Sequence, residues 1–367
     1  MNKNIKVLFV VTLILLFTFL PSCSSPGPTV QVLPALAEAN LSGKMVFILY
    51  NQKGNQIVQL DLATGKMVTL FAAPERSWLG AAEISPDGTQ LVLSYAPPPP
   101  RGKVQLAETG LYLMPLDSAA DAAAGAAALA ERALQPLLQP SRANESFTYP
   151  TWAPDGQWIY FTHTVPSTTN RLGIDTTIER ARLGGEVEVV LNSATWPRLS
   201  PDGKWMAFLT LSEFTSDNAL SLAGADGSNP AELVPARAFP IVDAPLFSPD
   251  GTEVYFSAPS PQGQAATGKA RLWPGSRADS WSFGARPVSA HSEPSDWFRV
   301  RVDGGEPGSL PEQITQVQDV NMIAAFSPDG QRLAYLSQTG LFVLKPDGSQ
   351  ITQLAALTGI GSLNWIE

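Results

Sequence analysis

The sequence of 367 residues contains one cysteine and two histidines. A single cysteine cannot form a disulfide within the chain, and two histidines cannot supply a three-histidine metal site. Basic residues are also scarce, because 24 Lys and Arg stand against 33 Asp and Glu, which gives a net charge of -9. Nucleic-acid binding depends on a basic surface that neutralises phosphates, so the composition argues against a nucleic-acid partner.

Charged residues make up only 16% of the chain, whereas hydrophobic residues make up 44%. Disordered chains combine low hydrophobicity with high charge, so this composition predicts a folded body. The 29 glycines and 32 prolines are spread along the chain without a collagen-like period. A globular domain is therefore expected.

The N-terminal residues have the pattern of an export signal. Lys3 and Lys6 precede an apolar run over 7–20, which is shorter than the roughly 20 residues that span a bilayer. We therefore predict a signal peptide over 1–22. A proline-containing stretch without amphipathic period follows it and predicts a tether over 23–42.

The single cysteine, Cys23, ends the segment Leu20-Pro21-Ser22-Cys23. This segment resembles the bacterial lipobox, in which a leucine lies three residues before a cysteine with a small residue between them. The resemblance implies a diacylglyceryl group on Cys23 and cleavage before it, and two acyl chains anchor a protein stably. The alternative is a buried or redox-active thiol. Lipidation would place the protein outside the cytoplasm, anchored by lipid to the bacterial cell envelope.

A repeated motif centred on Ser-Pro-Asp-Gly is the main signal in the rest of the chain. It occurs five times, over 84–95, 152–163, 199–210, 247–258 and 326–337. Proline fixes φ at the second position of a type I turn, aspartate suits the third, and glycine supplies a positive φ. Each motif therefore predicts a tight hairpin between two strands.

The residues after each turn alternate as those of a strand do. Trp158 and Tyr160 fall on one face of the predicted sheet, and Ile159 and Phe161 fall on the other. Apolar residues on both faces of antiparallel strands indicate sheets that stack against other sheets. Further strands follow each hairpin, so the repeated unit is a four-stranded meander, which is typical of a β-propeller blade.

The spacing of the motifs sets the number of blades. Two intervals are 47 and 48 residues long, and longer intervals are explained by insertions rather than additional blades. These insertions are expected at 96–109, 119–140 and 259–296. The second of them is alanine-rich and predicts a short helix.

A sixth unit lacks its own tetrad and supplies only three strands, over 44–50, 56–62 and 66–71. Its innermost strand is expected at 362–366, where Trp365 aligns with Trp152. The prediction is an all-β fold, a six-bladed β-propeller over 43–367 with four-stranded antiparallel blades. The C-terminal strand completes blade one and closes the ring.

On these five tetrads and their strands, residues 43–367 resemble the WD40-like repeats of the TolB-like propeller family and of prolyl oligopeptidase-type enzymes. The resemblance implies the fold. The chain departs from TolB by its lipobox and by the lack of a separate N-terminal α/β domain. It departs from the peptidases because no Gly-X-Ser-X-Gly elbow occurs and no hydrolase domain follows.

The residues of the propeller offer little for catalysis. Only His163 and His291 are present, and they read as a polar residue at a strand end and a solvated residue of an insertion. The aspartates of the tetrads are explained by turn chemistry. We therefore expect no enzymatic activity, no cofactor and no metal site. The alternative is a propeller hydrolase or lyase that acts on carbohydrate or peptide.

Binding residues are expected in long connections on the face opposite the tetrads, between the second and third strands of blades two, three and five. The connections are 96–109, 164–174 and 259–296. Long loops in compact domains are often functional. The third combines aromatic side chains with arginines, which are common in binding surfaces. Its candidates are Arg271, Trp273, Arg277, Trp281, Phe283, Arg286 and His291. The alternative is that these rings form a small core that holds the insertion on the propeller.

A second set of candidates lies two positions before each tetrad, where side chains are expected to face the central channel. The set is Glu83, Thr151, Arg198, Leu246, Ala325 and Asn364. No charge sign dominates in it, so Glu83, Arg198 and Asn364 are only weak candidates for a channel site. Together the signals predict a membrane-anchored extracytoplasmic binding module that presents its loop-bearing face to a protein or glycan.

Overall fold

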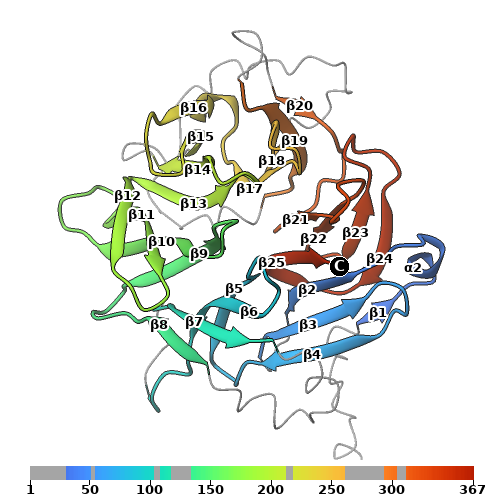
Figure 1. The fold of residues 1–367 in the computed structure, drawn as a ribbon, viewed down its shortest axis with the longest axis horizontal. Coiled ribbons are helices and arrows are strands. Elements are labelled where there is room, and N and C mark those ends of the chain that lie inside the picture. Colours follow the sequence, from blue (N-terminus) through green and yellow to red (C-terminus); the bar gives the residue numbers. More distant parts are fainter. Residues whose placement is uncertain are drawn as a thin grey trace, which may run out of the picture.

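The computed structural model describes residues 30–50, 54–102, 108–116, 134–211, 218–260, 293–303 and 311–367. These residues form six four-stranded antiparallel sheets arranged around a centre, with one sheet extended by a fifth strand (Figure 1). The predicted all-β, six-bladed propeller is therefore confirmed.

The first three blades follow the chain from the N-terminal side and are given from the innermost strand outwards. Blade one consists of β25 (Gly359–Ile366), β2 (Lys44–Leu49), β3 (Gln56–Asp61) and β4 (Met67–Ala72). Blade two consists of β5 (Trp78–Ile84), β6 (Gln90–Ala96), β7 (Gly110–Pro115) and β8 (Gln135–Leu138). Blade three consists of β9 (Ser146–Trp152), β10 (Trp158–Pro166), β11 (Ile174–Arg182) and β12 (Val187–Asn192).

The remaining blades continue around the ring in the same order. Blade four consists of β13 (Ala194–Leu199), β14 (Trp205–Leu211), β15 (Asn218–Gly224) and β16 (Ala231–Val234). Blade five consists of β17 (Asp243–Phe247), β18 (Glu253–Ala258), β19 (Asp296–Arg301) and β20 (Glu312–Gln313), and a 3₁₀ turn, η1 (Ala236–Ala238), precedes it. Blade six consists of β21 (Ile323–Phe326), β22 (Leu333–Leu336), β23 (Leu341–Leu344) and β24 (Thr352–Ala356).

The tetrads form the turns between the two inner strands of their blades. In the first, the Ser85 hydroxyl donates to Asp87 Oδ1 at 2.6 Å, and Gly88 has a φ of 72°. The serine-to-aspartate hydrogen bond recurs in three other tetrads, whereas the motif at 152–163 has Ala153 in the serine position. The Ser85 hydroxyl and the Thr89 N–H lower the pKa of Asp87. These aspartates hold turns together, as the sequence predicted.

The ring is closed by the two ends of the described chain. β25 pairs antiparallel with β2, with Lys44 opposite Ile366 and Phe47 opposite Leu363. In Figure 1 the red β25 lies beside the blue β2 at the inner end of blade one. The predicted closure is therefore confirmed. With β25 in place, β2 has a hydrogen-bonded strand on each side. Closure therefore leaves no unpaired edge on β2.

Residues before the predicted propeller boundary at 43 also pack on the ring. The short strand β1 (Gln31–Val32) pairs with β24 at the outer edge of blade six, and α2 (Ala35–Glu38) buries Leu36. The Leu33 N–H donates to Leu354 O at 2.9 Å. Residues 31–38, which fall inside the stretch predicted as a tether, are thus part of the folded body.

The insertions also differ in part from their predicted extents. The connection expected over 164–174 is mostly a longer hairpin, because β10 continues to Pro166 and β11 begins at Ile174. Strand β8 lies within the insertion predicted over 119–140 and supplies the outer strand of blade two. The predicted helix of that insertion, over 119–133, lies outside the described residues.

The hydrophobic core lies between neighbouring blades. One cluster joins Ile48 and Phe71 of blade one to Leu91 and Tyr95 of blade two. Similar clusters join blade two to three and blade three to four, and the largest extends from blade four through five and six to blade one. Each blade therefore buries both faces, as the apolar residues on both faces predicted.

Candidate functional site

The candidate site lies where the innermost strands begin, on the face opposite the tetrads. Three of these strands, β9, β13 and β17, carry a bulge in which two residues face one residue of the next strand. The first bulge residue has a positive φ in each case: Tyr149 at 49°, Trp196 at 56° and Ala244 at 50°. A positive φ in a non-glycine residue costs on the order of 1–3 kcal/mol and is enriched at functional sites.

A proline follows each of these bulge residues, three positions before the tetrad. These prolines are Pro150, Pro197 and Pro245. Proline cannot donate to a sheet ladder, so within a strand it favours a bulge. The bulge changes the direction of the preceding side chain. In blades three and four that side chain is a large aromatic ring.

A cavity of about 650 Å³ opens among these strand beginnings. Its walls come from five of the innermost strands, from Ser94 of β6 and from neighbouring loops. The lining residues are Tyr50, Trp78, Gly80, Ser94, Thr148, Tyr149, Trp196, Asn321, Met322, Ile323, Gln338, Thr358, Ile360 and Gly361. Pockets of roughly 300–1,000 Å³ accommodate small molecules. We call this cavity the central pocket.

Four aromatic side chains shape the central pocket. Tyr149 and Trp196 stack with ring centroids 4.2 Å apart and an interplanar angle of 15°. Trp78 and Tyr50 remain 47% and 40% exposed, so their rings are accessible to solvent or to a ligand. The pocket therefore combines a stacked aromatic wall with two exposed aromatic rings.

The polar groups of the central pocket are uncharged. Asn321 and Gln338 contribute carboxamides, and Ser94, Thr148 and Thr358 contribute hydroxyls. Among the described lining residues there is no Asp, Glu, Lys, Arg or His. Burial and the nearby Asp243 carboxylate raise the pKa of Tyr149, which keeps its phenol neutral. The pocket suits a ligand without net charge.

A cluster of charged residues lies behind the wall of the central pocket that β9 forms. His163 of β10 is within 2.8 Å of Glu179 Oε1 through Nδ1 and within 2.9 Å of Glu145 Oε1 through Nε2. A neutral imidazole has only one N–H, so two carboxylate partners require the protonated ring. We call these three residues the His163 bracket.

The His163 bracket reaches the pocket through Phe147. This ring stacks on the His163 ring with centroids 4.5 Å apart, and its carbonyl accepts hydrogen bonds from Ser94 and Thr109. The next residues along β9 are the lining residues Thr148 and Tyr149. The sequence prediction that His163 is only a polar strand-end residue was therefore incomplete.

The pKa values of the bracket follow from its contacts. The hydrogen bond to Glu179 raises the pKa of His163 above its ordinary 6.5 against the effect of burial, and the bond to Glu145 adds to the rise. Burial by itself would raise the pKa of Glu145. Hydrogen bonds from Ser141, His163 and Arg142 outweigh it and lower that pKa to about 2.

The predicted channel residues lie nearer the tetrad end and connect blades. Arg198 of β13 donates to Glu83 Oε2 of β5 at 3.1 Å, so blades two and four are joined across the ring. The Thr151 hydroxyl of blade three donates to Glu83 Oε1 at 3.5 Å. Asn364 Oδ1 accepts from the Ile84 N–H at 3.1 Å, and Asn364 Nδ2 donates to Ala82 O at 2.9 Å.

These contacts show the channel residues as links between inner strands. Leu246 and Ala325, the remaining two, are half-buried and pack against the hydrophobic core. None of the six channel candidates lines the central pocket. The pocket residues were missed because they lie at the beginnings of the innermost strands rather than two positions before the tetrads.

The other predicted site residues lie outside the described part of the chain. These are Cys23 and the insertion residues Arg271, Trp273, Arg277, Trp281, Phe283, Arg286 and His291. The ends of that insertion are described. The buried Asp296 carboxylate accepts hydrogen bonds from the Ser260 hydroxyl and from the Val317 and Gln318 N–H groups. This contact fixes both stems of the insertion on the loop-bearing face.

Within the described ranges, no three His, Cys, Asp or Glu side chains are grouped in a way that could hold a metal ion. The same part of the chain contains no helix with the length and apolar character needed to cross a bilayer.

Comparison with known proteins identifies the fold. No family model and no curated protein matches the sequence. The structure is similar to TolB from Acinetobacter baumannii, with a TM-score of 0.60, 14% identity, and coverage of 88% of this chain and 66% of that one. A putative TolB from Agrobacterium tumefaciens has a TM-score of 0.54 and 18% identity, with coverage of 88% of this chain and 92% of that one. An oligogalacturonate lyase in complex with manganese has a TM-score of 0.50 and 15% identity, with coverage of 86% of this chain and 74% of that one. The chain shares the propeller fold of TolB-like proteins.

Proposed function

We propose that this protein is an extracytoplasmic, membrane-anchored binding module whose central pocket holds an uncharged sugar unit of a glycan. The observation that carries the proposal is the lining of the 650 Å³ pocket, which combines four aromatic rings with carboxamides and hydroxyls. Aromatic faces pack against the C–H faces of sugar rings, and amides and hydroxyls both donate and accept hydrogen bonds as sugar hydroxyls require.

A glycan fits this pocket better than a protein surface does. Stable protein interfaces bury about 1,200–2,000 Å² over extended surfaces. The central pocket is instead a concave chamber lined by residues from five blades, and the exposed Trp78 and Tyr50 rings lie among its lining. Binding measurements with Trp78→Ala distinguish a glycan in this pocket from a protein partner on the same face.

Membrane anchoring is the second part of the proposal and is supported by the lipobox-like segment ending at Cys23. Gln31 already belongs to the propeller, because β1 pairs with blade six. Eight residues of fully extended chain reach at most about 28 Å. A lipid on Cys23 would therefore hold the propeller close to the membrane surface.

The anchoring prediction is tested by Cys23→Ala. We expect the variant to appear in the soluble extracytoplasmic fraction or to accumulate unprocessed, because the acyl chains that hold the protein on the membrane are missing. Fractionation followed by mass spectrometry of the N-terminus measures both outcomes. Membrane-bound wild-type protein with an unmodified N-terminus upstream of residue 23 would contradict the prediction.

The pocket prediction is tested by Trp78→Ala on an array of neutral oligosaccharides, followed by titration calorimetry with the glycans that bind. We expect affinity to fall at least about tenfold, because the variant removes an exposed aromatic face from the pocket. Trp205→Ala is the matched control, since Trp205 is similarly exposed at 42% but begins β14 next to a tetrad turn.

Three results would overturn the glycan assignment. Equal affinities of Trp78→Ala and the wild type would remove the pocket from recognition. Absence of binding to every neutral glycan, together with capture of an envelope protein that Trp78→Ala abolishes, would move the pocket to a protein ligand. Cleavage of a bound oligosaccharide would favour the hydrolase or lyase alternative.

A further inference from the structure

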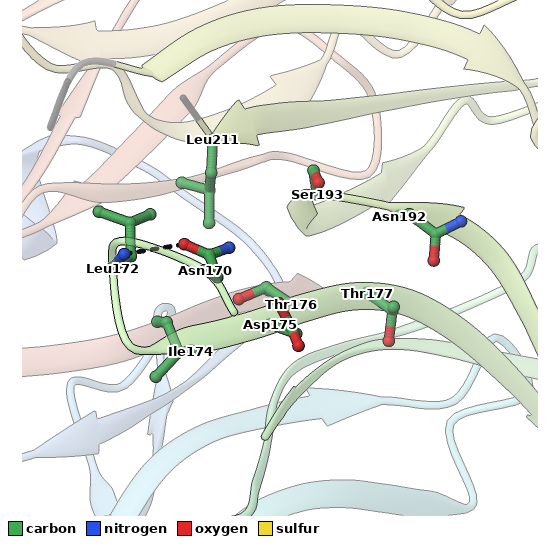
Figure 2. Close-up of a pocket in the computed structure, with 9 residues that line it drawn as sticks. All are labelled: Asn170, Leu172, Ile174, Asp175, Thr176, Thr177, Asn192, Ser193 and Leu211. Atoms are coloured by element: carbon green, nitrogen blue, oxygen red, sulfur yellow. Dashed lines mark hydrogen bonds between the residues drawn. The ribbon is translucent and has the colours of Figure 1, made fainter. Parts of the chain in front are cut away.

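A second, smaller cavity lies on the same face as the central pocket, between blades three and four. Its volume is about 130 Å³. Figure 2 shows β11 along one side, Asn192 and Ser193 on the opposite side, and the loop with Asn170 and Leu172 at one end. Leu211, at the end of β14, also lines this cavity.

The lining of this cavity differs from that of the central pocket. Asn170 contributes a carboxamide, and Thr176 and Ser193 contribute hydroxyls, whereas Asp175 points to the other side of β11 (Figure 2). The described lining contains no aromatic ring and no basic side chain. Such a set offers many hydrogen-bond acceptors together with amide and hydroxyl donors.

The hydrogen bonds already present give these polar groups direction. Asn170 Oδ1 accepts from the Leu172 N–H at 2.8 Å, which assigns its amide nitrogen as a donor on the other side (Figure 2). The aliphatic side chains of Leu172 and Leu211 supply an apolar surface beside the polar groups. Sugar units need both, because their rings present hydroxyls at the rim and C–H groups on the faces.

The two cavities are joined by one strand. Ser193 precedes β13 and lines the small cavity, whereas Trp196 lies within β13 and lines the central pocket. Three extended residues span roughly 10 Å. The Thr162 hydroxyl accepts from the Trp196 N–H at 2.9 Å and lies 3.2 Å from the Thr195 hydroxyl. The separation of the cavities is therefore fixed by a hydrogen-bonded strand.

We propose that the small cavity is a second sugar subsite, which binds a further hydroxyl-rich unit of the glycan held in the central pocket. This inference rests on the proposed function. It makes the ligand an oligosaccharide that extends from the centre of the ring towards the gap between blades three and four. Subsites built on one rigid strand recognise chain length as well as unit identity.

The test uses α-1,4-linked and β-1,4-linked glucose oligomers and N-acetylglucosamine oligomers, each from one to six units, in titration calorimetry with the full chain. For the wild type we expect affinity to rise at least about tenfold with length in one series. In the double variant Asn170→Asp, Ser193→Gly this rise should disappear while affinity for the shortest binding probe is unchanged. The first change keeps the oxygen that accepts from the Leu172 N–H, and Ser193 is exposed with a positive φ that glycine adopts readily, so the variant should keep the wild-type melting temperature.

Trp78→Ala distinguishes the subsite from the central pocket, because it should weaken binding of every length. A length-dependent gain that survives in the double variant overturns the subsite but leaves the proposed function standing. Equal affinity of the wild type for all oligomer lengths also overturns the subsite and leaves the proposed function standing. Failure of every probe to bind the wild type overturns both proposals.

Discussion

A protein that lacks residues 361–367 is expected to lose the cooperative unfolding transition of the propeller. The deletion removes most of β25, which supplies the inner strand of blade one and pairs with β2. Trp365 is 8% exposed, and its indole N–H donates to Ser42 O at 3.1 Å. Truncating a buried tryptophan alone costs about 3–5 kcal/mol, and domains are stable by about 5–15 kcal/mol in total.

The same deletion separates blade one from blade two. The Ser362 hydroxyl accepts from the Ala82 N–H at 2.8 Å, and Asn364 bonds to the same strand. Circular dichroism and urea titration of the truncated chain should show a broad, low-temperature transition. Removal of Glu367 alone is the control, because it follows β25 and is exposed. A truncated protein that melts cooperatively at the wild-type temperature would refute the closure role of β25.

Features set by local chemistry were predictable from the sequence. The Ser-Pro-Asp-Gly turns depend on residues within six positions of one another, as the contacts of Ser85 with Asp87 and Gln90 show. Their recurrence predicted five of the six blades. The match of Trp365 to Trp152 was also informative, because each indole N–H donates to a backbone carbonyl, of Ser42 and Glu83 respectively.

The central pocket was not predictable in the same way. Its lining residues occupy similar places in the blades but follow no common residue type, as Trp78, Tyr149 and Ile323 show. Repeats therefore give no signal for it. The available signal was the proline after Tyr149 and Trp196, which interrupts an inner strand three residues before the tetrad.

Contacts between distant segments explain the other differences. Leu33 lies in the proline-containing stretch predicted as a tether, and its hydrogen-bond partner on blade six, Leu354, lies more than 300 residues away in the sequence. Glu145 belongs to the loop between blades two and three and has no pattern of its own. Only the folded ring places it beside His163.

The His163 bracket is expected to make stability depend on pH. The folded-state pKa of His163 lies above 6.5, so its contribution is complete below pH 6.5 and is lost as the pH rises through that folded-state value. The folded-state pKa of Glu145 is about 2, below its ordinary 4.5, so its contribution is complete above pH 4.5 and is lost as the pH falls towards 2. The His163 bracket therefore contributes its full stabilisation of the folded state between pH 4.5 and pH 6.5.

His163→Gln tests this dependence. The variant cannot be protonated and removes the cation that both largely buried carboxylates share, leaving Glu145 only the more distant Arg142 at 3.8 Å, so we expect a loss of about 3 kcal/mol near pH 5.5. The difference from the wild type should shrink as the pH rises above the folded-state pKa of His163. Urea unfolding at several pH values measures both effects. Glu188→Gln is the control, because Glu188 pairs with Arg180 on the same blade but is 46% exposed.

The bracket also predicts a link between pH and ligand affinity. Loss of the His163 proton weakens the contacts that hold Glu145, and Phe147 stacks on the same ring directly before Thr148 and Tyr149 of the pocket wall. Wild-type affinity for a neutral glycan should therefore fall as the pH rises through the folded-state pKa of His163. In His163→Gln it should be lower and independent of pH over that range. A neutral glycan has no titrating group, so a pH-dependent affinity that persists in His163→Gln would assign the effect to another residue and refute the bracket as its source.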